Sequence, residues 1–181
     1  MTNRTLVVSI DALITADIPV LKQLPNLGRV MEHASWITDI ECIYPTLTYP
    51  CHATIATGCW PDRTGINNNE IPDFFAKGRM DWYWWREAIQ VPTVVDFARQ
   101  AGLTASTVTW PVMCASGAEY NIGEIWAPRE EDDPTPWFTR ANSPAVAKIF
   151  EANKHMLRWM KTPQMDEFAA KCAADIIRAH R

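Results

Sequence analysis

The chain has no excess of positive charge. Its 17 lysines and arginines stand against 21 aspartates and glutamates, so the formal net charge is -4 over 181 residues. The surface as a whole does not attract a polyanion, and a phosphate would have to be bound by a local site. We therefore expect no nucleic acid polymer among the partners. Apolar residues make up 48% of the chain, the usual share for a globular core, which argues against disorder.

The sequence also lacks paired cysteines and long apolar runs. Its 5 cysteines never form a C-x-x-C pair, and the odd number fits reduced thiols in the cytosol. We expect most of them to be small buried side chains. The apolar run at the N-terminus is too short for a signal peptide, and no other run approaches the length of a membrane span. These absences predict a cytoplasmic protein that does not associate with a membrane.

Patterns typical of strands and helices alternate along the chain. The apolar run TLVVSI (5–10) predicts a strand covered on both faces, and residues 103–110 predict a second strand. Helices are predicted over 25–34 and 92–102 and after each of two Ser/Thr-Pro pairs, Ser143-Pro144 and Thr162-Pro163. This order predicts an α/β fold with a mostly parallel sheet. The positions expected to face the core are Leu27, Val30 and Met31, then Val94, Phe97, Ala98 and Ala101, and finally Met165, Phe168, Ala169, Cys172 and Ile176.

Two irregular stretches, 67–87 and 127–142, resemble insertions over one edge of that sheet. The first contains an aromatic cluster, Trp82 to Trp85. Such rings could stack on a base or another flat group, although packing against the core or another subunit explains them more simply. Ligands of open parallel sheets bind beyond the carboxyl ends of the strands, so residues at those ends are the first candidates for chemistry.

Thr48 is one such candidate, because it lies at or next to the start of a helix that runs to Gly58. It could simply cap this helix by accepting a backbone N–H. The free N–H groups of a helix start also stabilise a bound phosphate or a developing alkoxide. A threonine hydroxyl is a poor nucleophile at neutral pH unless a base or a metal ion removes its proton. Of these two activators, a metal ion is the better candidate here.

The position of Asp11 supports the hypothesis of a bound metal ion, since it directly follows the first predicted strand. It could cap the next turn, or it could share a divalent cation with Thr48 if the two lie close together. Cys51 with His52 is a rival pair, in which an imidazole would activate a thiol in the first helical turn. Adjacent helical residues point about a hundred degrees apart, so we expect His52 to pack against its surroundings and bond to backbone instead.

The order of several motifs resembles that of the type I phosphodiesterase and nucleotide pyrophosphatase family of the alkaline phosphatase superfamily. The resemblance rests on VVSIDAL (7–13), PNLGRVMEHA (25–34) and YPTLTYPCHATIATGCWPDRTGINNN (44–69), and more loosely on residues 91–111. It implies an alkaline-phosphatase-like three-layer αβα sandwich, incomplete in this chain. Residues 1–181 would then be the N-terminal part of a single catalytic domain.

The resemblance also implies site residues. Thr48 is similar to the family's nucleophile, which becomes phosphorylated during the reaction, and Asp11 with Thr48 would be metal ligands. Asn69 and the backbone N–H of Tyr49 would bind the phosphoryl oxygens of the substrate. Two divalent ions, expected to be Zn²⁺, would activate Thr48 and stabilise the leaving oxygen. We expect their remaining ligands beyond residue 181.

The expected reaction is hydrolysis of phosphodiester or pyrophosphate bonds in a small-molecule phosphoester substrate. Two alternatives stay open: a non-catalytic module of the same fold that binds a nucleotide or another small ligand, and a cysteine-dependent enzyme. The sequence does not decide whether the protein forms an oligomer.

Overall fold

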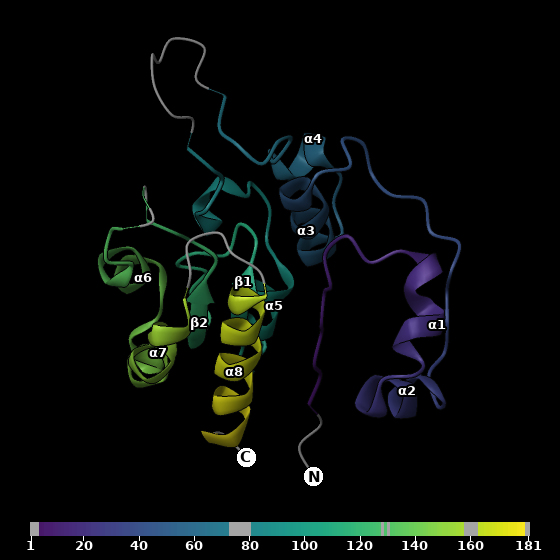
Figure 1. Ribbon diagram of the computed structural model, residues 1–181. Helices are drawn as coiled ribbons and strands as arrows, with labels where there is room; N and C mark the ends of the chain where they lie inside the picture. Colours follow the sequence, from purple (N-terminus) through teal and green to yellow (C-terminus); the bar gives the residue numbers. More distant parts are fainter. Residues whose placement is uncertain (1–3, 73–80, 128, 130, 158–162, 180–181) are drawn as a thin grey trace. The chain divides into compact units, whose positions relative to one another are not determined.

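The computed structural model describes residues 4–72, 81–127, 129, 131–157 and 163–179 (Figure 1). The chain divides into two compact units, Met1–Cys42 and Ile43–Arg181, and each is described by itself. The helices of the first unit are η1 (Thr15–Asp17), α1 (Ile18–Leu21) and α2 (Pro25–Met31). The elements of the second unit are α3 (Thr48–Thr57), α4 (Pro61–Thr64), η2 (Arg86–Ala88), α5 (Val94–Gln100), β1 (Ser106–Trp110), β2 (Tyr120–Gly123), α6 (Thr135–Ala141), η3 (Pro144–Val146), α7 (Ala147–Asn153), η4 (Lys154–Met156) and α8 (Gln164–Ala179).

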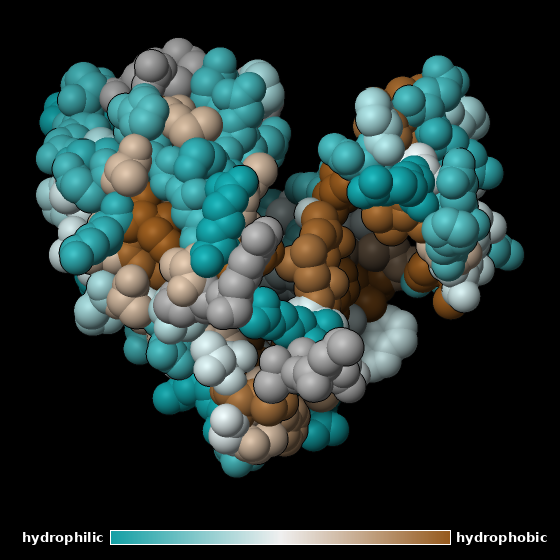
Figure 2. All heavy atoms as spheres, turned by 90° about the horizontal axis from the view of Figure 1, so that it is seen from below, coloured by the Kyte–Doolittle hydropathy of each residue, from teal (hydrophilic) through white to brown (hydrophobic). Residues whose placement is uncertain are grey.

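The prediction of a buried strand over residues 5–10 is wrong for this structure. The segment is irregular, and Leu6, Val7 and Val8 are 71%, 64% and 70% exposed. Brown hydrophobic residues lie open on the face that Figure 2 shows. A β-branched run becomes a strand only when neighbouring strands accept its backbone hydrogen bonds and cover its side chains. The described part of the N-terminal unit has no such neighbours.

Helix α2 begins at Pro25 as predicted, but its buried face is different. Gly28 is its buried residue, whereas Leu27 and Val30 are exposed. A side chain at position 28 would collide with the carbonyl oxygen of Lys22, which lies 2.3 Å from where a Cβ would be placed. The close approach of α1 and α2 therefore depends on this glycine rather than on an apolar stripe.

The C-terminal unit is built around a short parallel sheet with the order β1-β2. β1 lies within the predicted strand 103–110, and β2 was not predicted, because YNIG is too short to show a periodicity. Figure 1 shows α6 and α7 on one side of the two strands, α3 on the other and α8 alongside β1. The predicted α/β class is confirmed, with a sheet that is incomplete.

The sheet contains one irregularity that matters for the site. Val108 pairs with Ile122 and Trp110 with Gly123, so Thr109 is an extra residue in β1. Thr109 has a positive φ of 46°, which is uncommon for a β-branched residue. Val108 packs on the main core cluster, and Trp110 packs on a second cluster formed by Ala56, Val95, Met113 and Ala118. The extra residue therefore turns Trp110 to a different surface from Val108.

The last helix agrees closely with its prediction. Phe168, Cys172 and Ile176 are buried along one face of α8, at a spacing of four residues. Phe168 meets the rings of Phe138 and Phe150, so α6, α7 and α8 share one core. The predicted cap of this helix, Thr162, lies outside the described residues.

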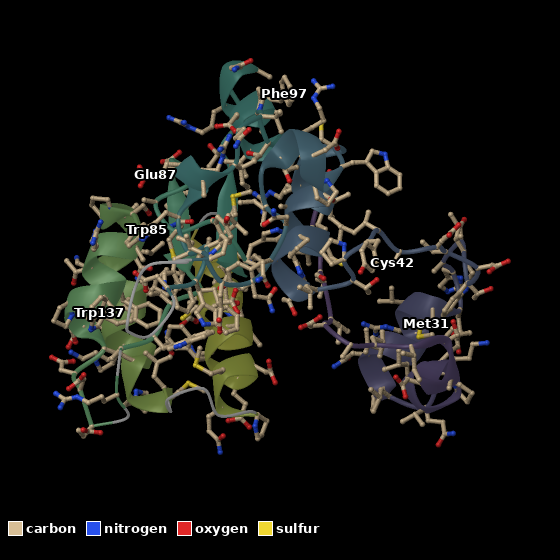
Figure 3. The ribbon with its side chains drawn as sticks, turned by 90° about the horizontal axis from the view of Figure 1, so that it is seen from above. Met31, Cys42, Trp85, Glu87, Phe97 and Trp137 are labelled. Atoms are coloured by element: carbon tan, nitrogen blue, oxygen red, sulfur yellow. The ribbon has the colours of Figure 1, made fainter. Side chains whose placement is uncertain are left out.

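The predicted face of the helix over 92–102 is wrong. Val95 is the buried residue of α5, whereas Val94 is 63% and Phe97 57% exposed. Figure 3 shows Phe97 on the outer side of the helix. The apolar positions repeat at helical spacing on two sides of this short helix, so periodicity alone could not identify the inner face.

Ser143 does not cap a helix as predicted. Its hydroxyl donates to the carbonyl oxygen of Glu119 at 2.7 Å and accepts from the N–H of Asn121 at 2.9 Å. These bonds join the segment before η3 to β2, and a proline-started 3₁₀ turn then leads into α7. A hydroxyl that satisfies strand backbone groups is no longer available to the helix.

Candidate active site

Thr48 is the first residue of α3. The N-cap is Leu47, an extended residue whose side chain offers no acceptor, so Thr48 occupies the first helical position rather than the N-cap. Pro50 occupies the first turn, where its missing N–H costs no helical hydrogen bond. The helix ends at Gly58, which has a φ of 69° and donates to Thr54. The helix start that carries Thr48 thus forms where the sequence predicted it.

His52 packs and bonds to backbone, as expected. Its side chain is 6% exposed, and Nδ1 lies 2.8 Å from the carbonyl oxygen of Thr48. Its ring meets the ring of Trp110 edge to face, with centroids 5.2 Å apart. Because the carbonyl oxygen can only accept, Nδ1 carries the hydrogen of this bond.

The structure brings Asn69 to the start of α3. The N–H of Tyr49 donates to Oδ1 of Asn69 over 2.9 Å, across 20 residues of sequence. This contact fixes the side-chain amide so that Oδ1 faces Tyr49 and Nδ2 points elsewhere. The Tyr49 N–H, predicted to bind a phosphoryl oxygen, holds Asn69 in this structure.

Backbone pairing within the first predicted insertion supports Asn69. Tyr83 donates to the carbonyl oxygen of Asn69 at 3.0 Å, and Glu70 and Trp82 form an antiparallel bridge. Ile71 donates to Asp81 at 2.6 Å, so the chain pairs with itself on both sides of residues 73–80, which lie outside the described residues. Residues 128 and 130 of the second predicted insertion also lie outside them.

The aromatic cluster packs against the core. Trp84 is 7% exposed and stacks on Trp82 at 5.6 Å, and both rings meet the ring of Tyr49. Trp126 closes the group, 4.4 Å from Trp84. Burial, with a further contribution from Glu124, raises the pKa of the Tyr49 hydroxyl far above its ordinary value. The side chain of Tyr49 is fully buried and is thus part of the core beneath the helix start.

The prediction that most of the cysteines are buried is wrong. Cys114 and Cys172 are buried, Cys42 is exposed, and Cys51 and Cys59 are intermediate. Burial raises the pKa of Cys114 and of Cys172 to about 12, so both stay protonated near neutral pH. Cys51 lies in the first turn of α3, but Nδ1 of the neighbouring His52 bonds to Thr48 instead.

Asp11 belongs to the N-terminal unit, so its predicted partnership with Thr48 stays a prediction. Its side chain accepts from the N–H of Ala12 at 3.0 Å, in a turn where Ala12 has a φ of 57°. Both residues offer hard oxygen atoms that suit a divalent cation. Within the described ranges, no group of three or more His, Cys, Asp or Glu residues could hold a metal ion.

Among the helices described, none has the length and apolar character needed to cross a bilayer.

A protein family matches nearly the whole chain. The sequence pattern of the type I phosphodiesterase / nucleotide pyrophosphatase family covers residues 5–171, including the helix start, Asn69 and the parallel strands. The chain belongs to this family. The members named below are enzymes, and the mixed α/β structure is consistent with part of an alkaline-phosphatase-like fold.

Several curated proteins are similar to this chain at low identity. Human ectonucleotide pyrophosphatase/phosphodiesterase family member 1 is 28% identical over 112 residues, which are 57% of this chain and 11% of the relative. Human bis(5'-adenosyl)-triphosphatase ENPP4 is 27% identical over 114 residues, 60% of this chain and 24% of the relative. Venom phosphodiesterase 2 of Crotalus adamanteus is 26% identical over 151 residues, 78% of this chain and 16% of the relative. The chain thus spans less than a quarter of the length of each, and no solved structure matches it significantly.

Sequence reasoning missed Trp110. Its indole N–H donates to the carbonyl oxygen of His52 at 3.3 Å, so it contacts the helix that begins at Thr48 from a strand 58 residues further on. A tryptophan at the end of a predicted strand was visible in the sequence, but the direction of its side chain depends on the extra residue Thr109.

Proposed function

We propose that this protein is a phosphohydrolase that cleaves phosphodiester or pyrophosphate bonds, with Thr48 as its nucleophile. The observation that carries the proposal is the approach of Asn69 to Tyr49 at the start of α3, within a chain of this family. It places a side-chain amide beside the residue that follows the nucleophile. The substrate is a small-molecule phosphoester, as the names of the relatives suggest.

In the proposed reaction, Oγ1 of Thr48 loses its proton and attacks the phosphorus atom. The bond to the leaving oxygen breaks, and that oxygen takes up a proton in turn, so that an alcohol or a phosphate departs. The phosphothreonine that remains is hydrolysed by water: a bond from the water oxygen to phosphorus forms, the bond to Oγ1 breaks, and the Thr48 hydroxyl is restored as the phosphate product leaves. Negative charge on the non-bridging oxygens is stabilised by Nδ2 of Asn69, because Oδ1 is held by the Tyr49 N–H. The partial positive charge of the helix start acts in the same direction.

Metal ions are the proposed cofactors. When bound, two divalent ions would lower the pKa of the Thr48 hydroxyl and stabilise the leaving oxygen. The hard oxygens of Asp11 and Thr48 fit such ions chemically, but a zinc ion takes about four ligands. These two residues are therefore only part of a donor set, whose other members we expect elsewhere in the full protein. Zinc remains a proposal beside other divalent ions.

The test is hydrolysis of bis-nitrophenyl phosphate by the longest form of the protein that can be made. Thr48→Ala removes the attacking oxygen and should lower kcat by about 1,000-fold or more. Thr46→Ala is the matched control, because this exposed hydroxyl two residues away donates only to the Ile43 carbonyl oxygen. A chelator should abolish the activity and added zinc should restore it. Full activity in Thr48→Ala would refute the proposed nucleophile.

The same assay addresses the alternative of a non-catalytic module. A nucleotide that changes tryptophan fluorescence without turnover, with or without metal, would favour binding alone.

We also propose a cytoplasmic location, based on the odd number of cysteines. Recovery of the protein in the secreted or membrane fraction would contradict it.

A further inference from the structure

We infer that His52 and Trp110 are positioning residues that hold the first turn of α3, and with it Thr48, in the orientation needed for attack. This inference rests on the proposed function and goes beyond it, because neither side chain need touch the substrate. It assigns a task to the buried His52 and its half-buried partner Trp110 that a merely structural core would not require.

The first contact joins His52 to the residue that carries the nucleophile. Nδ1 donates to the carbonyl oxygen of Thr48 at 2.8 Å, from one helical turn further along α3. The peptide group of Thr48 and Tyr49 thus has both of its polar atoms held by side chains: the oxygen by His52, and the N–H by Asn69 at 2.9 Å. A peptide plane held at both ends limits the movement of the Thr48 Cα atom, and therefore of the side chain attached to it.

The second contact fixes His52 itself. The indole of Trp110 meets the imidazole edge to face at 81°, with centroids 5.2 Å apart. Its N–H donates to the carbonyl oxygen of the same histidine at 3.3 Å. Trp110 therefore holds both the ring and the backbone of His52, which is 6% exposed and has little room to rotate.

The third observation is the irregular backbone that delivers Trp110. Thr109 is the extra residue of β1 and has a φ of 46°, and Val112 and Ala115 follow with 60° and 54°. Without the extra residue, Trp110 would share a face with Val108 and point to the main core instead of the second cluster. Such strained positions cluster at functional sites, where the surroundings hold them in place. Here the strain aims one side chain at the nucleophile-bearing helix.

The experiment compares two replacements of His52 in the hydrolysis assay described above. His52→Asn places an amide nitrogen near the position of Nδ1, whereas His52→Gln places it near Nε2. We expect His52→Gln to lower kcat by about 10- to 100-fold with KM little changed, because misplacement by about an ångström costs that much. His52→Asn should recover most of this loss. His155→Asn, at an exposed position, is the matched control.

Amide hydrogen exchange across Thr48–His52 is the second readout, and it does not depend on turnover. Exchange should be faster in His52→Gln than in His52→Asn, while the two variants unfold at the same temperature. Equal kcat and equal exchange in the two variants would overturn the inference. If neither His52 variant folds, Trp110→Phe takes their place: it keeps the ring, loses the indole N–H and should lower kcat by about fivefold. Unchanged kcat in that variant would then overturn the inference.

Failure of the proposed function has a different signature. In that case the unmodified protein does not hydrolyse the diester, or Thr48→Ala remains active, whatever the His52 variants do. If Thr48→Ala is inactive and His52→Gln is fully active with unchanged exchange, only the positioning inference fails.

Discussion

The side-chain amide of Asn69 has two ends with different tasks in the proposed site. Asn69→Asp keeps an oxygen acceptor for the Tyr49 N–H but replaces the Nδ2 donor with a negatively charged oxygen. We expect kcat/KM to fall by about 100- to 1,000-fold, with thermal stability nearly unchanged. Asn69→Leu also leaves the Tyr49 N–H unpaired and should lower the free energy of unfolding by about 1–3 kcal/mol.

Enzyme kinetics and urea unfolding separate these two effects. Asn67→Asp supplies the control for charge, since it makes the same change at an exposed position two residues away. Equal losses of stability in Asn69→Asp and Asn69→Leu would contradict the assignment of Oδ1 to the Tyr49 N–H.

Single residues were predictable where local geometry decides their contacts. The packing of His52 follows from its place on a helix, and the structure confirms it with the bond to Thr48. Whether Thr48 is the N-cap or the first helical residue was not predictable, because helix ends are uncertain by a residue or two when they are read from sequence. Trp110 could not be assigned to the site at all, since its direction depends on the extra residue in β1.

The start of α5 is stabilised by a charge-assisted capping box, which yields a pH-dependent prediction. Burial alone would raise the pKa of Asp96, but hydrogen bonds from Arg86 at 2.5 Å and from the N–H of Thr93 at 2.7 Å outweigh it. The pKa therefore lies below its ordinary value of 3.8. The resulting stabilisation is complete above this unfolded-state value and is lost as pH falls through the lower folded value.

Asp96→Asn should accordingly lower the free energy of unfolding by about 1 kcal/mol at pH 7, the usual worth of a cap. The difference from the unmodified protein should disappear below the pKa of the folded state. Urea unfolding at several pH values measures both effects, with the exposed Asp39→Asn as control. A deficit that persists undiminished at pH 2 would show that the carboxylate charge is not its source.

Whole elements were predictable where one strong pattern defines them. α8 carries a single apolar stripe over sixteen residues, and Phe168, Cys172 and Ile176 are buried as predicted. α2 and α5 have only seven residues each, and their apolar side chains lie on more than one side. Their inner faces are decided by Gly28 and Val95 through contacts with other elements. The prediction of a strand over residues 5–10 is wrong for the same reason, because a strand requires partner strands that its own sequence does not contain.

The two units differ in how they are stabilised. The buried hydrophobic side chains that the structure describes all come from residues 43–181, where one large and one small cluster hold the helices on the sheet. Between residues 4 and 42 the buried position is a glycine, and Leu6, Val8 and Ile37 are among the exposed side chains. Buried apolar area is the main source of stability, so the described N-terminal residues contribute little of it.

This asymmetry predicts two classes of amide exchange in the 181-residue chain. Amides of residues 5–42 should exchange through local opening within seconds, whereas those of β1, β2 and α8 should be protected up to the free energy of global unfolding. Hydrogen exchange read by mass spectrometry measures both in one experiment, and brief proteolysis should cut first before Ile43. Protection of residues 5–10 equal to that of α8 would contradict the prediction. It would mean that Leu6, Val7 and Val8 are covered in solution, as the sequence pattern of a buried strand requires.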